Sequence, residues 1–307
     1  MSQNPSSLVP SSNQLGKLRT SDDLLICTAC GTQYDFTEGL SNCRICDDPR
    51  QFVPASGQQF TTLKKLRSDG YKLVFKQDED DDKVGIGQRA LLIQTPQGNI
   101  LWDLVCFLDQ EAVKKINSLG GLRLIIISHP HFYTTWSDWS ETFHVPVFLA
   151  KADAEWVNRS VAHSQIGWVE DRHTTLLPGV TAIVAGGHFP GSMMLHTATP
   201  NTKVPTLFHA DTIMTVMDAH TPDPGRPGHI SYTFMWSVPN MIPLGPEQVL
   251  QIWRAMKGFG VEATYGFTTV RYKKGDRKTI PERVLESAQM FVKSIGYEEH
   301  AIFSEGN

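Results

Sequence analysis

The order of apolar and polar positions predicts a chain that is first rich in strands. Three short β-type runs, at residues 71–77, 89–95 and 99–105, are separated by polar segments that contain glycine, which predicts hairpins. The acidic run Asp78 to Asp82 falls between the first two runs and predicts a solvated loop.

From about residue 110 the apolar pattern alternates between helical and strand-like periods. Helices are predicted at 110–120, 151–160, 245–260 and 281–296. Strands are predicted at 122–129, 145–150, 175–187, 193–198, 206–213 and 261–266. Along the chain, a strand-rich region is followed by a region that alternates strands and helices, and this succession occurs twice. Such a layout favours two face-to-face sheets with helices outside.

Composition changes this picture mainly by excluding partners. The chain has 307 residues, 40% of them hydrophobic, and a formal charge of −4 without a dense basic stripe. Such a surface is not typical of proteins that bind nucleic acid or an anionic membrane. The chain lacks a secretion signal and an apolar run of about 18 residues. We therefore expect a soluble, cytoplasmic protein whose polar residues 1–20 form a disordered tail.

Four of the five cysteines form two CxxC pairs close to the N-terminus. Cys27 and Cys30 are followed, after twelve residues, by Cys43 and Cys46. Two such pairs converge on one tetrahedral ion and leave no position open for a substrate. Two disulfides are the alternative, but disulfides suit oxidising compartments. The fifth cysteine, Cys106, lies in an apolar context and is predicted to be a buried core thiol.

The segments "CTACGTQYD" and "CRIC" resemble the knuckles of rubredoxins and rubredoxin-like zinc ribbons. The loop between the pairs is shorter than in rubredoxins, which favours structural zinc over redox iron. We expect a zinc-binding knuckle at 21–57 and a main domain at 60–307.

Histidine and aspartate side chains stand where predicted strands end. His129 and His131 end one strand, His188 ends another, and Asp211 ends a third. Residues i and i+2 of an extended chain point the same way, so His129 and His131 can bind one ion together.

The motifs "SHPHFYTTW", "GGHFPGS" and "FHADTI" resemble, in order and spacing, three metal-binding motifs of the metallo-β-lactamase fold superfamily. The resemblance spans roughly residues 60–295 and implies a four-layer αβ/βα sandwich. It also implies that His129, His131 and His188 hold a first metal, with Asp211 as the bridge to a second.

A narrower resemblance joins "CTACGTQ", "DDPRQFV", "HPHFY" and "PNMIPL". These segments look like an uncharacterised group of bacterial and fungal proteins in which a four-cysteine knuckle precedes such a domain. This resemblance says far more about the fold and the metal sites than about the reaction.

The chain departs from the superfamily pattern at the second metal. Tyr133 and Thr134 stand where Asp and His are expected, and Tyr265 stands near the position of a final His. A single metal is therefore expected, with zinc favoured and iron or manganese as alternatives. Three imidazoles with an open position lower the pKa of zinc-bound water from about 15.7 to about 7. If Asp211 also binds the metal, the site is either closed or expands to five ligands.

Two residues of the same loop are candidates for catalysis. Asp138 is a candidate general base or replacement ligand, and a helix N-cap or surface carboxylate is the alternative. Tyr133 is a candidate donor to an oxyanion, with core packing as the alternative. His209, two residues before Asp211, is a candidate additional ligand or a partner of one.

These residues leave three functions open. The first is a mononuclear zinc hydrolase that acts on a small-molecule ester, lactone or thioester. The second is a catalytically degenerate metal-binding scaffold, and the third is a redox protein with iron in the cysteine site. The apolar segment 220–244 predicts either a lid over the metal site or a protomer interface, so a homo-oligomer is compatible with the sequence.

Overall fold

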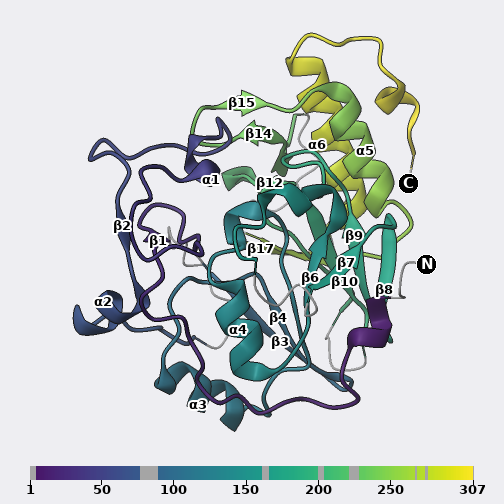
Figure 1. Cartoon of the computed structure of the whole chain (residues 1–307). Helices are drawn as coiled ribbons and strands as arrows, with labels where there is room; N and C mark the ends of the chain where they lie inside the picture. The colour runs from purple at the N-terminus through teal and green to yellow at the C-terminus, as the bar shows by residue number, and fades with distance from the viewer. Residues whose placement is uncertain are drawn as a thin grey trace. The chain divides into compact units, whose positions relative to one another are not determined.

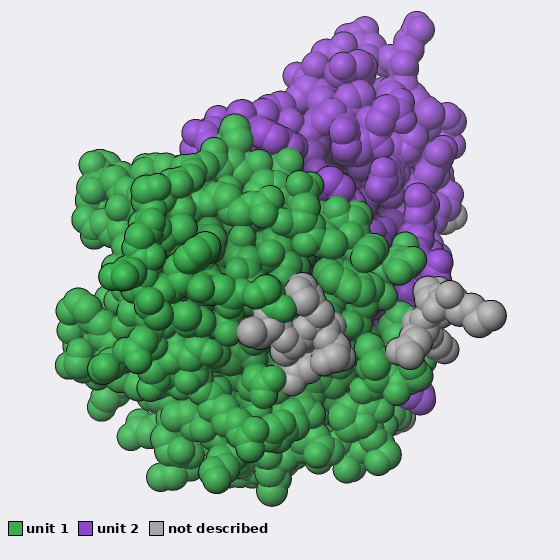
Figure 2. Space-filling view, viewed as in Figure 1, with its two compact units in different colours: residues 1–77, 86–170 green, residues 78–85, 171–307 purple. Residues whose placement is uncertain are grey.

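The computed structural model describes seven stretches of the chain, residues 5–76, 89–160, 166–199, 204–220, 228–266, 268–273 and 276–306. The chain divides into two compact units, coloured green and purple in Figure 2. Residues 1–77 and 86–170 form the first unit, and residues 78–85 and 171–307 form the second. The acidic run Asp78 to Asp82 lies outside the described residues.

The first unit contains a five-stranded sheet in the order β3-β4-β5-β6-β7 (Figure 1). Strands β3 and β4 form an antiparallel hairpin, and β4 to β7 are parallel. Parallel neighbours need crossover connections, and helices α3 and α4 supply two of them. The bounds are β3 Leu91–Thr95, β4 Gly98–Trp102, β5 Leu124–Ile126, β6 Val147–Ala150, β7 Ile166–Val169, α3 Gln110–Ser118 and α4 Trp136–Phe143.

Helix α3 shows how local sequence sets an element of this unit. Asp109 caps it by accepting a hydrogen bond from the backbone N–H of Ala112. Its buried face consists of Ala112, Val113 and Ile116, which recur at helical spacing. The helix therefore buries this face in the apolar core of the unit.

The second unit contains a six-stranded sheet in the order β17-β16-β11-β10-β9-β8. Neighbours are antiparallel except β11 and β16, which are parallel. Helix α6 begins with a capping box between Thr279 and Glu282, and with α5 it contributes to the core of the unit. The bounds are β8 His173–Leu177, β9 Val180–Val184, β10 Met193–Thr197, β11 Thr206–Phe208, β16 Ala263–Tyr265, β17 Thr269–Arg271, α5 Pro246–Met256 and α6 Ile280–Ser294.

Shorter elements complete both units. Those of the first unit are η1 Pro5–Leu8, β1 Ile26–Cys27, α1 Arg44–Asp47, β2 Phe60–Thr61, α2 Leu63–Ser68, η2 Pro130–Phe132 and η3 Lys151–Trp156. Those of the second are β12 Met214–Thr215, η5 Met217–His220, β13 Tyr232–Thr233, β14 Met235–Ser237, β15 Ile242–Pro243 and η6 Ala301–Ser304.

The prediction of two sheets accompanied by helices, with a small four-cysteine cluster near the N-terminus, is confirmed. Each unit has a mixed sheet accompanied by helices, and the four cysteines gather in the first unit. The predicted boundary between knuckle and main domain stays a prediction. No helix among the described residues is both long and apolar enough to cross a membrane.

Three predictions of secondary structure were wrong. Residues 71–76 form no strand, and 151–156 form 3-10 turns in place of an α-helix. Helix α4 was missed, although its apolar residues Trp136, Trp139 and Phe143 recur at helical spacing.

The prediction of a disordered N-terminal tail was also wrong for residues 5–20. Gln14 forms a two-way backbone bridge with Leu122, and the backbone N–H of Lys17 donates to Thr142. The carboxamide of Asn13 accepts from the backbone of Asn99. Hydrogen bonds from polar side chains and backbone groups hold this segment to the first unit. The polar composition predicts disorder, because it offers little apolar surface to bury.

Candidate functional site

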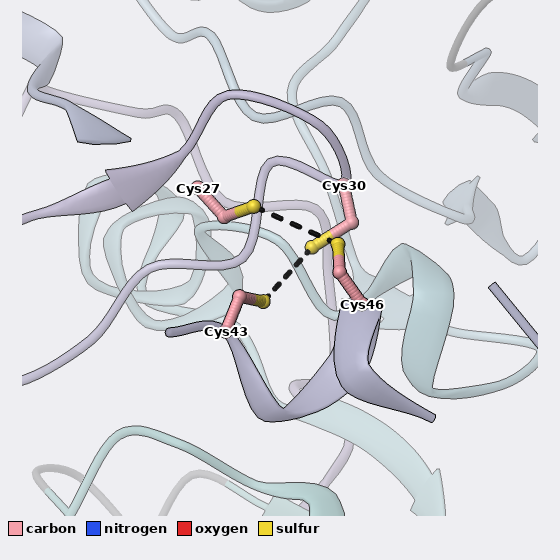
Figure 3. A group of neighbouring side chains, drawn as sticks. All are labelled: Cys27, Cys30, Cys43 and Cys46. Carbon is pink, nitrogen blue, oxygen red and sulfur yellow. Dashed lines mark hydrogen bonds between the residues drawn. The ribbon is translucent and has the colours of Figure 1, made fainter. Parts of the chain in front are cut away.

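The four cysteines of the knuckle converge as the two CxxC pairs predict. Figure 3 shows their sulfur atoms turned toward one another. The Sγ atoms of Cys27 and Cys46 lie 3.7 Å apart, and those of Cys30 and Cys43 lie 3.6 Å apart. Sulfurs bound at 2.3 Å to a tetrahedral zinc ion would be about 3.8 Å apart. The four cysteines form no disulfide, and the separations of their sulfurs fit a tetrahedral metal ion such as zinc.

Two neighbouring side chains complete the environment of the cysteine sulfurs. The Tyr34 hydroxyl donates to Cys43 Sγ at 3.0 Å, and the Thr32 hydroxyl lies 3.2 Å from Cys30 Sγ. Hydrogen bonds from the other cysteines lower the pKa of Cys43, with a further contribution from Tyr34. This environment favours a thiolate, the form that binds metal, at Cys43, whereas hydrogen bonds with Cys27 raise the pKa of Cys30 and Cys46.

The loop after β5 carries His129 and His131, both buried. The Ser128 hydroxyl lies 2.9 Å from His129 Nδ1, and the backbone N–H of Ser128 donates to Asp103 Oδ1 at 2.7 Å. With Nδ1 donating to the hydroxyl, Nε2 of His129 keeps its lone pair for a metal. Asp103 follows β4 and adopts φ of 58°, a conformation that aspartate tolerates better than most residues.

His188 and Asp211 form the second pair of ligand candidates. The Nδ1 of His188 lies 2.8 Å from the backbone carbonyl oxygen of Trp236, an acceptor, so Nδ1 carries the proton. The Nε2 of His188 therefore offers its lone pair, and it lies 3.7 Å from Asp211 Oδ2. Two donors that are each about 2.1 Å from a tetrahedral ion lie about 3.4 Å apart, close to this separation.

The ligand candidates come in two pairs, His129 with His131 in the first unit and His188 with Asp211 in the second, and these four residues are a group that could hold a metal ion. The chain therefore has a His/Asp metal-binding group beside its four-cysteine group. Imidazole nitrogen and carboxylate oxygen suit zinc, iron and manganese alike, so the donor set alone does not select the metal.

Tyr133 is buried, and its ring belongs to the apolar core of the first unit. Its hydroxyl has no hydrogen-bond partner among the described residues. Burial, with the charge of Asp153 as a smaller cause, raises the pKa of Tyr133 well above its ordinary value. Tyr133 is thus a core residue that keeps an unused donor.

Asp138 is the third residue of α4 and lies outside the His/Asp group. Its Oδ2 accepts from Gln33 Nε2 at 3.0 Å, and its Oδ1 accepts from the backbone N–H of Ser21 at 3.1 Å. Arg159 Nη1 lies 3.8 Å from Oδ1. Burial raises the pKa of Asp138, although these contacts oppose the shift. The contacts favour a structural role and give no support to the role of general base.

His209 also lies outside the group. A Cβ on Gly266 would come within 2.1 Å of His209 Cε1, so the imidazole packs directly against this glycine. Tyr265, near the position of the expected final His, packs its ring on Phe208 at 5.7 Å. The imidazole of His209, which directly follows β11, therefore fills the space beside Gly266. The expected final His would instead have come from the chain near Tyr265 in β16.

Sequence reasoning missed the residues that orient the histidines. Ser128 and Asp103 follow the neighbouring strands β5 and β4. A polar residue directly after a buried strand was the sequence signal that could have identified each of them. The carbonyl of Trp236 could not be found from residue types, since every residue carries one.

Comparison with known proteins gives one relative in sequence and several distant likenesses in structure. No family model matches the chain. It is 33% identical over 282 residues to the uncharacterized protein YmaE of Bacillus subtilis (strain 168), covering 89% of this chain and 97% of YmaE.

Two solved structures are similar at lower identity. An S60 mutant of the HARLDQ-motif metallo-β-lactamase of Cronobacter sakazakii is 17% identical, with a TM-score of 0.42, over 71% of this chain and 90% of that one. BJP-1, a subclass B3 metallo-β-lactamase of Bradyrhizobium japonicum, is 16% identical, with a TM-score of 0.40, over 66% and 84%. The chemistry of the site is therefore argued from its own residues.

Proposed function

This chain belongs to the family of the Bacillus subtilis protein YmaE, and we propose that it is a mononuclear zinc hydrolase of the metallo-β-lactamase fold superfamily. The observation that carries the proposal is the convergence of His129, His131, His188 and Asp211. The proposed substrate is a small ester, lactone or thioester. Bound zinc would supply a Lewis acid and make water nucleophilic near neutral pH.

The residues around the histidines support this function by holding protons at defined atoms. The carbonyl of Trp236 can only accept, so it holds the Nδ1 proton of His188, and the hydroxyl of Ser128 would hold that of His129 when it accepts from Nδ1. Each imidazole is then fixed in orientation, with Nε2 available as the ligand. Asp211 is the fourth donor or, if it moves aside, leaves that position to substrate.

Tyr133 is the proposed donor to an oxyanion, a role that requires its buried hydroxyl to become accessible to the substrate. Its phenol stays protonated, because burial raises the pKa of the group. A buried hydroxyl without a partner costs about 1–3 kcal/mol, and a substrate oxygen would offset this cost by accepting its hydrogen bond. Tyr133→Phe should therefore lower kcat by about 10²-fold or more and change zinc content little.

The test is turnover of an ester, lactone and thioester panel by the zinc-loaded protein. His188→Ala should abolish any turnover found, whereas His144→Asn should preserve it. His144 is exposed and adopts φ of 52°, which asparagine also tolerates, and it lies outside the His/Asp group. Inertness of the loaded wild-type protein toward the whole panel would favour the scaffold function instead.

A further inference from the structure

Gln33 connects the cysteine knuckle to the loop that carries His129 and His131. Its two sequence neighbours, Thr32 and Tyr34, contact the sulfurs of Cys30 and Cys43. Gln33 itself is fully buried, and its backbone N–H donates to the carbonyl oxygen of Thr134 at 3.1 Å. Residues 32–34 therefore contact the cysteine site through Thr32 and Tyr34, and the histidine loop through Gln33.

The side chain of Gln33 makes a second connection to the same region. Its Nε2 donates to Asp138 Oδ2 at 3.0 Å, and its Oε1 accepts from Arg159 Nη1. Arg159 Nε in turn donates to Asp35 Oδ1 at 2.6 Å. Gln33, Asp138 and Arg159 are each at most 4% exposed, so these hydrogen bonds are shielded from water.

The segment that receives these bonds needs support. Thr134 has φ of 41°, a left-handed conformation that is costly for a β-branched residue. It lies three residues after His131 and directly before the first turn of α4. A strained backbone persists only where its surroundings hold it, and the Gln33 N–H supplies one such contact.

We propose that the four-cysteine knuckle positions the histidine loop through Gln33, so that zinc in the knuckle raises the affinity of the histidine site for its own metal. Gln33 is a positioning residue and touches neither metal. Because binding free energies are linked, zinc in the histidine site raises the affinity of the knuckle by the same factor. The inference rests on the proposed metal site but not on hydrolysis.

The test compares Gln33→Ala with Gln59→Ala in the full chain. Gln59 has an exposed side chain, and its backbone carbonyl, which alanine keeps, accepts hydrogen bonds from Thr28. Zinc affinity of each site is measured by competition with a chromophoric chelator, and amide exchange is followed over 129–139. Gln33→Ala should weaken the histidine site about tenfold and speed exchange in this stretch, while Gln59→Ala leaves both near wild type.

A swapped pair keeps the test informative if Gln33→Ala fails to fold. In Asp138→Asn the new amide N–H faces a hydrogen-bond donor, such as Gln33 Nε2, in place of a carboxylate oxygen. When Gln33→Glu is combined with it, the new carboxylate at position 33 can accept from that amide, so one hydrogen bond is restored with donor and acceptor exchanged. The double variant should regain most of the affinity that Asp138→Asn loses.

Wild-type affinity and exchange in Gln33→Ala, or an equal effect of Gln59→Ala, would overturn the inference. So would a double variant no better than Asp138→Asn. If wild-type protein holds no zinc at the histidines, the proposed function fails by itself, and amide exchange still decides whether Gln33 positions the loop.

Discussion

The hydroxyl oxygen of Ser128 lies 2.9 Å from Nδ1 of His129. This contact fixes the tautomer and orientation of a ligand candidate without itself reaching the metal. Ser128 thus connects the end of β5 to the chemistry of the site.

Ser128→Ala should lower zinc affinity at the histidine site about 10- to 100-fold, because the His129 ring loses the group that orients it. Ser140→Ala is the matched control, since Ser140 is buried in the same unit and its hydroxyl bonds the Val145 carbonyl at 2.6 Å. Equal affinity in the two variants, measured by chelator competition, would contradict the role of Ser128.

Loss of one knuckle thiol should remove the knuckle zinc. Cys43→Ala leaves three ligands, and zinc held at about a thousand times its Kd stabilises a fold by about 4 kcal/mol. We expect a loss of that order in urea unfolding at that zinc concentration, together with one zinc fewer per chain.

Cys106→Ala is the control for the knuckle variant. Cys106 lies outside the four-cysteine group, and burial raises its pKa to about 11, so it stays a thiol. It should keep full zinc content. The purified wild-type protein should also be colourless, since iron bound by four cysteines absorbs visible light; a coloured protein would favour the redox function.

Metal ligands could be found from the sequence of this protein, whereas long-range hydrogen-bond partners could not. The cysteines and the His129–His131 pair were found because metal ligands need particular residue types at particular spacing. Asp138 was misjudged because the same residue type serves a buried hydrogen-bond network, and its partners Gln33 and Arg159 lie 105 and 21 positions away. The order of residues 5–20 depends on long-range backbone bonds that composition does not encode.

The ordered N-terminal segment gives a stability prediction. A Cβ on Gly121 would come within 2.2 Å of the Gln14 carbonyl oxygen, whereas one on Gly120 would meet only Asn13 and Asn99 at 3.5 Å. Both glycines have positive φ, 104° at Gly120 and 79° at Gly121, so both alanine variants carry a backbone cost, and that of Gly120→Ala is no smaller. Gly121→Ala should lower the free energy of unfolding by about 1–3 kcal/mol more than Gly120→Ala does. Equal losses would show that the segment does not pack on Gly121.

His196 should make the protein less stable in acid. Burial lowers the pKa of this β10 histidine, and its Nε2 has no partner among the described residues. Below the unfolded pKa of about 6.5 the unfolded chain binds the proton more readily, so stability present above that pH is lost as pH falls through the folded pKa.

In urea unfolding, wild type should lose more stability between pH 7.5 and pH 5 than His196→Leu does. Parallel losses in the two proteins would exclude His196 as the cause.

Zinc content per chain, measured by native mass spectrometry on wild type and His131→Ala, tests the central claim most directly. The account predicts two zinc ions in the wild type, one in each group, and one in the variant, held by the cysteines. A single zinc in both proteins would contradict a metal site at the histidines.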